Sequence, residues 1–206
     1  MAIDFQKTTY AGRTPVIWRG ECKVLPGGFK PKNTLTLGSR IKRGAPLFVD
    51  FDNNEAAVIK IVKVLSGGTT SAPRVAKGHY FAAGDVLMKI GKTDASPTVS
   101  SVDSSNTAYD VLNLSAAISG LTEGDVLVEA TAYAAAEGSG EATPAAEKYI
   151  PNAVVSADLE VKNKLDTLDA AYEAVVLYPS VDYPIPDSWK QGIALKNNPN
   201  IVLIKQ

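Results

Sequence analysis

The sequence predicts a mainly β protein: a small antiparallel β sandwich or barrel with an extended N-terminal arm and a C-terminal α-helical segment. Three observations lead to this fold class. Between residues 45 and 130, short apolar runs alternate with turn residues every 8–15 positions, the spacing of small sandwiches and barrels. Before them, Pro and Gly interrupt any regular element. After residue 156, apolar residues recur at helical spacing.

Four segments follow from these changes of pattern along the 206 residues. Residues 1–43 form a basic extended N-terminal arm, and 44–132 form a β-rich domain. Residues 133–155 form a flexible linker or loop of small and acidic residues, a composition typical of flexible connections. Residues 156–206 form a helix, a short helix and a terminal strand. The composition, 45% hydrophobic and 21% charged, is that of a chain with a folded core.

Charge is distributed unevenly along the chain, although the net charge is only −1. Residues 1–43 contain nine Lys or Arg and two carboxylates, a balance of +7, so the remaining chain carries −8. The positive charges are spread out with no run of three, so we expect a protein partner and no nucleic acid. Two interpretations stay open: the arm binds an acidic partner surface, or basic and acidic segments pair inside one fold. In the first, the contact residues are Arg13, Arg19, Lys30, Lys32, Arg40, Lys42 and Arg43.

The central region is predicted to consist of β strands. Residues 45–51 alternate in polarity, and the β-branched run 56–65 follows a turn at Asp52-Asn53-Asn54. The sequence Gly-Asp-Val-Leu occurs twice, from Gly84 and from Gly124, and each copy predicts a tight turn leading into an apolar strand. The further short strands are expected at 74–78, 85–91, 98–103, 110–115 and 125–132.

The C-terminal segment has the pattern expected of a helix. Ser156 or Asp158 can cap its N-terminus, apolar residues recur at intervals of 4, 3, 4 and 3, and Pro179 ends it. Because so short an isolated helix is marginal in water, its apolar seam must pack, either on the chain's own β domain or against other copies. The seam consists of Val161, Leu165, Leu168, Tyr172 and Val175.

The tail beyond the helix contains a short helix from Asp187, a turn at Asn197-Asn198-Pro199 and a terminal strand over 201–205. A strand so close to the C-terminus stays ordered only when it pairs with a sheet, on its own chain or on a neighbour's.

The residues that usually perform catalysis are scarce. His79 is the single histidine and Cys22 the single cysteine, and no phosphate-binding glycine motif occurs. Four carboxylates, Asp103, Asp110, Glu123 and Asp125, could line a glycosidase cleft, but each occupies a position that favours a β-turn. We therefore expect no enzyme activity, no cofactor and no metal. No apolar run is long enough to cross a bilayer and no export signal is evident, so we expect no membrane partner.

Two stretches carry a resemblance to a known family. Residues 77–130 contain a Gly-Asp-Val-Leu turn, then VSSVDSSN, YDVLNL and a second Gly-Asp-Val-Leu, and the chain closes with PDSWKQGIALKNNPNIVLIKQ. These stretches resemble head fibre and head decoration (auxiliary capsid) proteins of tailed bacteriophages. The resemblance implies a structural virion protein on the outer surface of the capsid, commonly a homotrimer. It implies binding to the major capsid protein or another head protein, and no catalytic residues. The basic arm and the predicted helix favour a head fibre or an elaborated auxiliary protein.

Two other classes of function remain as alternatives. A carbohydrate- or receptor-binding β module would present a cluster of exposed aromatic side chains, whereas the seven aromatics between residues 45 and 150 show no cluster. A glycoside hydrolase would bring acidic residues together in a cleft.

Overall fold

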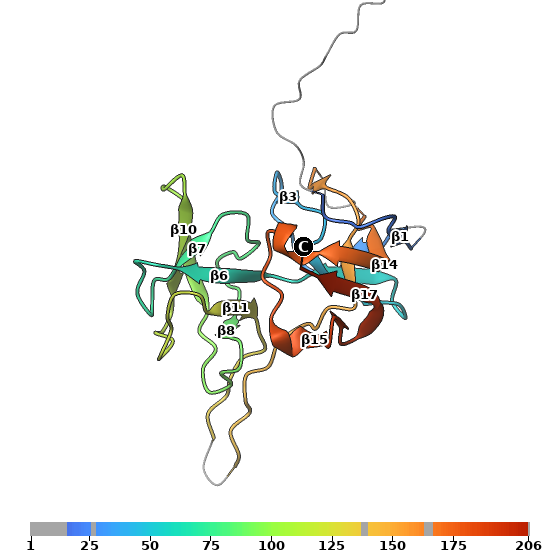
Figure 1. Ribbon diagram of the computed structural model, residues 1–206. Coiled ribbons are helices and arrows are strands. Elements are labelled where there is room, and N and C mark those ends of the chain that lie inside the picture. Colours follow the sequence, from blue (N-terminus) through green and yellow to red (C-terminus); the bar gives the residue numbers. More distant parts are fainter. Residues whose placement is uncertain (1–15, 26–27, 137–139, 163–166, 206) are drawn as a thin grey trace, which may run out of the picture.

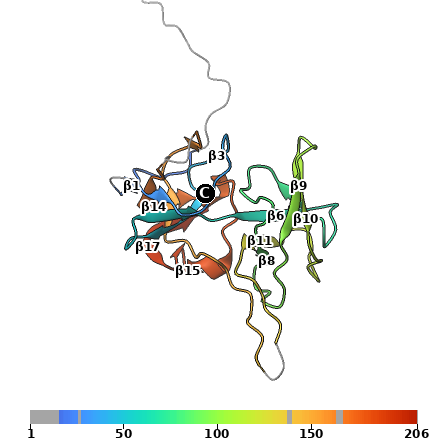
Figure 2. The ribbon, with the colours of Figure 1, turned by 180° about the vertical axis from the view of Figure 1, so that it is seen from behind.

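The computed structural model describes residues 16–25, 28–136, 140–162 and 167–205. Strands account for 41% and helices for 3%, and the antiparallel sheets are curled. The prediction of a mainly β protein is therefore confirmed. The strands form two lobes side by side (Figures 1 and 2), each built around its own large sheet.

The large lobe contains residues 16–58 and 153–205 and is built around a sheet of nine strands in the order β15-β16-β17-β14-β12-β4-β5-β2, with β1 also paired to β14. Most of its pairs are antiparallel, but β14 with β17 and β2 with β5 are parallel. A small separate pair joins β3 (Arg40–Ile41) to β13 (Leu159–Glu160). The nine strands are β1 (Lys23–Val24), β2 (Lys30–Pro31), β4 (Pro46–Asp50), β5 (Glu55–Val58), β12 (Ala153–Val155), β14 (Ala170–Leu177), β15 (Lys190–Gln191), β16 (Ala194–Leu195) and β17 (Asn198–Ile204).

The small lobe, residues 61–129, contains a six-stranded antiparallel sheet in the order β8-β11-β6-β7-β10-β9. The sheet is curled so far that its two edges meet. Val86, just before edge strand β8, and Thr98, just before edge strand β9, form an antiparallel bridge. Leu112, Ile118 and Leu127 are fully buried in its core. Its strands are β6 (Ile61–Leu65), β7 (Arg74–Ala76), β8 (Leu87–Lys89), β9 (Val99–Asp103), β10 (Tyr109–Leu114) and β11 (Val126–Glu129).

The small lobe is an insertion between two strands of the large lobe. The run 56–65, predicted as one strand, is divided: β5 ends at Val58 in one sheet and β6 begins at Ile61 in the other. The chain returns after β11, and the Glu129 N–H donates to the Lys60 carbonyl at 2.9 Å. The two crossings of the chain between the lobes are therefore hydrogen-bonded to each other.

The described residues between 16 and 43 form three short strands, β1, β2 and β3, and are not a detached arm. β1 and β2 pair with strands of the large sheet, and Phe29 bridges to Leu168. Ile17, Phe29 and Ile41 are buried in the large core. The segment packs here because its apolar residues cover the sheet, which offsets the entropy lost on ordering. Residues 1–15 lie outside the described chain.

The predicted C-terminal α-helix is wrong, because residues 170–177 form strand β14. β14 pairs with three strands: β12 along its first residues, β17 along its last, and β1. These pairings bury Ala170, Ala171, Ala174 and Val176, and they override the weak helical spacing. The only helices among the described residues are the short 3₁₀ turns η1 (Tyr178–Ser180) and η2 (Asp187–Trp189). The terminal strand exists as β17 and pairs with its own chain.

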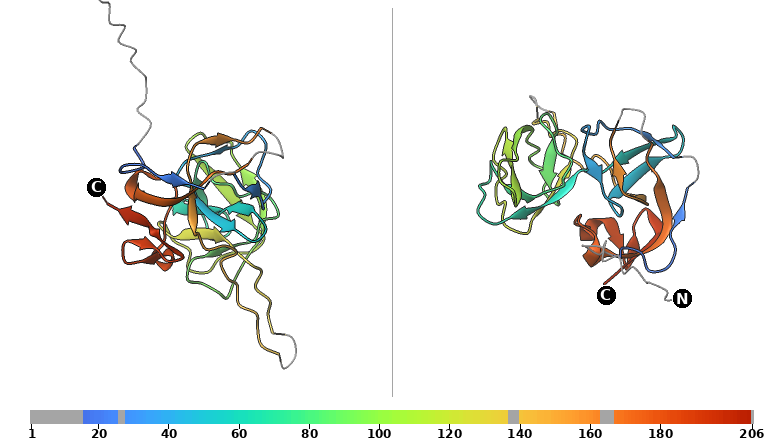
Figure 3. Two further views of the ribbon diagram at one scale, coloured as in Figure 1. Left: turned by 90° about the vertical axis from the view of Figure 1, so that its right-hand side faces the viewer. Right: turned by 90° about the horizontal axis from the view of Figure 1, so that it is seen from above.

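A β-hairpin projects from the junction of the lobes, beyond both sheets (Figures 1 and 3). This projecting hairpin comprises residues 131–136 and 140–146, and all but its first two residues fall in the segment that the sequence assigns to a linker. Bridges Ala130 with Glu147 and Ala134 with Thr143 join its two strands. No helix in the described part of the chain has the length and apolar character needed to span a membrane.

Candidate functional site

The junction between the lobes holds two of the buried charged side chains of the described chain, Lys60 and Glu129. At its centre, the Lys60 ammonium contacts both carboxylate oxygens of Asp85 at 2.7 Å, and the lysine side chain is only 6% exposed. Beside the second crossing, Lys148 donates to Glu129 Oε1 at 2.7 Å. Each buried charge therefore has a partner from another segment, as burial of charge requires.

The small lobe contributes a buried cluster of three charged or titratable groups. The His79 side chain is 3% exposed, and its Nε2 lies 3.2 Å from Asp110 Oδ2 in a poorly aligned contact. Its Nδ1 accepts the Phe81 backbone N–H at 3.2 Å. Lys77 donates to the other oxygen of Asp110 at 2.5 Å. An Nδ1 that accepts leaves the proton of the neutral ring on Nε2, facing the carboxylate.

Burial and charge act in opposite directions on this cluster. Burial lowers the pKa of His79 below 6.5 and outweighs the opposing attraction of Asp110. Burial alone would raise the pKa of Asp110, but hydrogen bonds from Lys77 and Ser104 bring it below 3.8. At neutral pH the cluster therefore contains a neutral imidazole, a carboxylate and an ammonium.

Tyr80 links this loop to the large lobe. Its hydroxyl contacts the Tyr183 hydroxyl, and the two rings stack with centroids 5.7 Å apart. The same hydroxyl accepts the Lys42 backbone N–H at 3.3 Å and lies 3.4 Å from the Arg40 carbonyl. Burial raises the pKa of both tyrosines, so both hydroxyls stay protonated.

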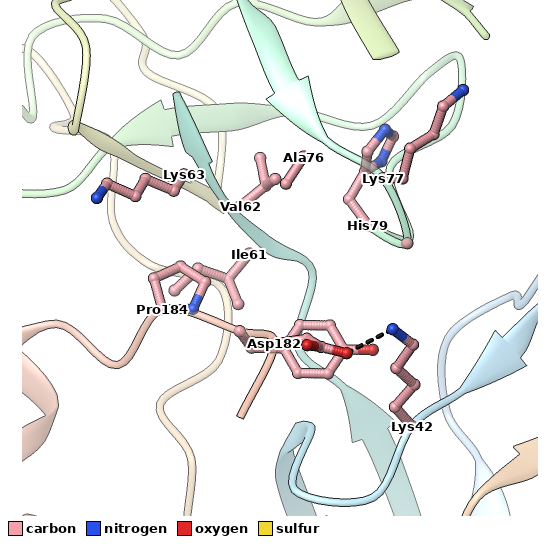
Figure 4. A pocket seen from close by; sticks show the side chains of 11 residues that line it. Lys42, Ile61, Val62, Lys63, Ala76, Lys77, His79, Asp182 and Pro184 are labelled. Atoms are coloured by element: carbon pink, nitrogen blue, oxygen red, sulfur yellow. Dashed lines mark hydrogen bonds and ion pairs between the residues drawn. The ribbon is translucent and has the colours of Figure 1, made fainter. Parts of the chain in front are cut away.

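Two cavities flank His79. The one in Figure 4 is about 30 Å³, lined by Lys77 and His79 from the small lobe and by the ion pair Lys42–Asp182 from the large lobe. The other is a cleft of about 210 Å³, in which Thr36 and Ser39 line one side. The opposite side consists of His79, Tyr80, Phe81, Val102, Ser104 and Asp110.

No hydroxyl or thiol among the described residues is hydrogen-bonded to a ring nitrogen of His79. One nitrogen of His79 accepts a backbone N–H and the other faces Asp110, while the Ser104 hydroxyl also bonds to Asp110. A nucleophile activated by histidine needs a free ring nitrogen within hydrogen-bond reach. Among the described residues, no three His, Cys, Asp or Glu side chains come close enough to hold a metal ion.

The predicted partner-contact residues lie on the large lobe, and most of them pair within the chain. Lys32 contacts Asp50 at 2.5 Å, Arg40 contacts Asp158 at 2.7 Å, and Lys42 pairs with Asp182. Lys30 lies 3.8 Å from Glu55, and the Arg43 backbone N–H donates to Asp158 at 2.9 Å. Lys30, Lys32, Lys42 and Arg40 therefore pair with carboxylates of their own chain, as the second interpretation of the charge pattern expects. Arg19 is exposed, and Arg13 lies outside the described residues.

The five residues of the predicted seam do not form one stripe. Tyr172 and Val175 are half-buried on β14, and their spacing of three places them on opposite faces of a strand. Leu168 and Val161 are buried in the large core near β14 and β13. Leu165 lies outside the described residues.

The four candidate carboxylates act separately in turns and ion pairs. Asp125 accepts the Thr122 N–H at 2.7 Å and pairs with Lys89, and Asp103 accepts the Ser105 N–H at 2.9 Å. Asp110 belongs to the His79 cluster, and Glu123 is exposed. Gly84 and Gly124 both have φ near +90°, which explains glycine before each aspartate. Each Gly-Asp pair forms the predicted turn before a strand.

The exposed large aromatics among the described residues are Phe51, 62% exposed, and Tyr133, 36% exposed. Phe51 lies in a turn of the large lobe against Phe29, and Tyr133 lies on the projecting hairpin. They therefore do not form the stacking platform that a carbohydrate-binding module presents.

Sequence reasoning missed the polar contacts of the junction. The available signals were Lys60, a charge inside an apolar run, and the aspartate that follows each turn glycine. Nothing in the sequence pairs Tyr80 with Tyr183, because 103 residues separate them. No protein-family model, no curated protein and no solved structure matches the chain.

Proposed function

We propose that the protein is a structural component of a tailed-phage virion, a head fibre or decoration protein on the outer surface of the capsid. It binds the major capsid protein or another head protein and assembles as a homotrimer. It works by surface contact and catalyses no reaction.

The segments that carry the family resemblance support this proposal because they build both lobes. Residues 77–130 make up most of the small lobe, including β8 to β11. The closing segment supplies η2, β15, β16 and β17, which form one end of the large sheet. The resemblance therefore rests on residues that determine the fold, rather than on a peripheral tail.

The projecting hairpin is the single observation that carries the proposal. All of its described residues from 131 to 136 and from 140 to 144 are exposed, and most are small. Two strands alone are marginally stable in water. A hairpin that extends past both lobes therefore presents backbone and apolar surface suited to a second protein. The hairpin offers few free backbone N–H groups along its edges, because the Tyr133 N–H donates to Ser96 and Pro144 has no N–H. We therefore propose that the hairpin binds its partner through the faces that its side chains form.

Charge supports a protein partner for the same element. No Lys or Arg occurs between Lys92 and Lys148, so the hairpin carries only acidic charge. On the large lobe, Arg19 is exposed and no carboxylate among the described residues pairs with it. We retain Arg19 as a contact candidate from the basic set.

The test is co-sedimentation of the purified chain with undecorated heads of its own phage. In one variant, Asn-Gly joins Ala134 directly to Thr143, a two-residue turn compatible with their hydrogen-bonded pairing. The matched control is Glu123→Gln, an exposed change at a turn of the small lobe. We expect wild type and the control to sediment with heads and the shortened hairpin to stay in the supernatant. A wild-type chain that never sediments with heads would refute the proposal.

A further inference from the structure

We propose that His79 is a proton-operated latch, whose protonation releases the loop 78–81 and weakens the contact between the two lobes. The latch depends only on contacts within the fold, so it does not depend on which partner the protein binds.

The first step of the argument is the hydrogen bonding of the neutral ring. Nδ1 of His79 accepts the N–H of Phe81, two residues further along the same loop. An imidazolium ring has a proton on both nitrogens and can accept no hydrogen bond. Protonation therefore sets two N–H groups against each other, and the 78–81 loop cannot keep its conformation.

The second step is the connection from the loop to the other lobe. Tyr80 lies between His79 and Phe81, and its hydroxyl accepts the Lys42 N–H and contacts the Tyr183 hydroxyl. The Tyr80 side chain is 9% exposed and belongs to the core shared with the large lobe. A change of backbone at His79 and Phe81 therefore moves the side chain that ties the lobes.

The third step is the space around the ring. His79 lines both the small cavity of Figure 4 and the cleft of about 210 Å³. Close-packed side chains resist displacement, but here a charged ring can turn toward the cleft and become hydrated. The loop can thus open without unfolding β7 or β8.

The charged groups around His79 come from several elements. Asp110 on β10 and Asp85 before β8 favour the charged ring, whereas Lys77, just after β7, opposes it. Across the small cavity lie the paired Lys42 and Asp182 and, on β6, Lys63. Burial dominates over these charges and lowers the pKa of His79 below its ordinary 6.5.

The direction of the pH effect follows from that shift. The open loop exposes His79, which then has its ordinary pKa of 6.5, and the closed loop binds the proton less readily. The closed state is therefore fully stable above pH 6.5, and each unit below 6.5 weakens it about tenfold until the lower pKa is passed.

The test uses the single histidine of the chain, whose NMR signals need no assignment among several. Imidazole shifts and amide hydrogen exchange of Phe81 and Lys42 are measured from about pH 7.5 to 5, with exchange corrected for its intrinsic pH dependence. We expect both amides to lose about tenfold protection per pH unit below 6.5, until the pKa read from the imidazole shifts is passed. Loss at Phe81 with no change at Lys42 would overturn the coupling, and unchanged protection at both would overturn the latch.

Two variants sharpen the result. His79→Gln keeps an acceptor and a donor but does not titrate, so the pH-dependent loss should vanish at both amides. Tyr80→Phe removes the hydroxyl that Lys42 bonds, so the loss should persist at Phe81 and disappear at Lys42. A pH-dependent loss in His79→Gln equal to that of wild type would assign the effect to another group. If that variant does not fold, the wild-type comparison of titration and exchange still decides.

Discussion

Lys60 and Asp85 form a buried ion pair, with both carboxylate oxygens 2.7 Å from the ammonium, where the chain passes from one sheet to the other. Asp85 also accepts the Ala82 N–H at 2.7 Å in the turn before β8. One aspartate thus closes a turn of the small lobe and holds the lysine at the crossing.

Lys60→Met should strongly destabilise the protein, because it leaves the Asp85 carboxylate largely buried without its counterion. Breaking a buried pair on one side typically costs about 3 kcal/mol or more. Urea unfolding monitored by tryptophan fluorescence measures this loss. Lys23→Met is the control, because its pair with Glu173 is exposed and surface pairs contribute little. Equal effects of the two changes would contradict the importance of the crossing.

Asn198→Leu should cost about 1–3 kcal/mol, because it removes a buried amide that donates to two partly buried carbonyls. The Asn198 side-chain amide, at the start of β17, donates at 2.8 Å to the carbonyls of Asn152, just before β12, and Tyr172 on β14. Thermal and urea unfolding report the change. The neighbouring Asn197 is exposed, so Asn197→Leu should leave stability nearly unchanged. A neutral Asn198→Leu would show that these bonds are replaceable.

Leu168→Ala should destabilise the fold. The circular dichroism spectrum of the wild-type protein should show no helical minima. Leu168 is fully buried and bridges to Phe29, and truncation of such a leucine costs about 2–5 kcal/mol. Because Leu168 packs within its own chain, the mass in solution should not change with the substitution. If the substitution lowered the mass of the assembly in solution without destabilising the monomer, Leu168 would lie at an interface between copies.

Removal of residues 1–43 should prevent folding of the large lobe. The deletion takes away the buried side chains Ile17, Phe29 and Ile41 together with β1, β2 and β3. The deletion variant is compared with Arg19→Ala, which removes a single exposed side chain, by its soluble expression and its resistance to proteolysis. A stable, soluble product of the long deletion would show that residues 16–43 are dispensable for the fold.

Asp50 should contribute to stability at neutral pH and lose that contribution in acid. Hydrogen bonds from Lys32 and Asn53 lower its pKa from 3.8 to about 2. A folded-state pKa below the unfolded value stabilises the fold above pH 4, and this contribution disappears as the pH falls toward 2. Urea midpoints of wild type and Asp50→Asn should therefore differ at pH 7 and converge near pH 2. A constant difference would exclude this ion pair as the cause.

The sequence predicted those features that depend on local chemistry. Turn glycines with aspartate, alternation over 45–51 and the β-branched content of the central region all specify strands and turns without distant partners. The C-terminal strand was also predictable as a strand that needs a sheet, and β17 pairs with β14 on one side and β16 on the other.

The features that the sequence did not reveal depend on distant pairing. Residues 170–177 have apolar side chains on both faces of β14, buried at Ala170, Ala174 and Val176 on one face and half-buried at Val175 and Leu177 on the other. That pattern also fits helical spacing. Likewise, two lysines interrupt the apolar run 56–65, and the sequence does not distinguish Lys60, which is buried at the break between two sheets, from Lys63, which is exposed on β6. The His79 cluster unites residues from the loop after β7 with Asp110 on β10, and no short sequence motif indicates this contact.

The most direct measurement is a cryo-EM reconstruction of heads from the phage that encodes this chain. We expect density for the two-lobed body on the outer surface, in three copies around a symmetry axis, with the projecting hairpin contacting a neighbouring protein. Heads that lack this density while the chain remains free in the lysate would contradict the central claim.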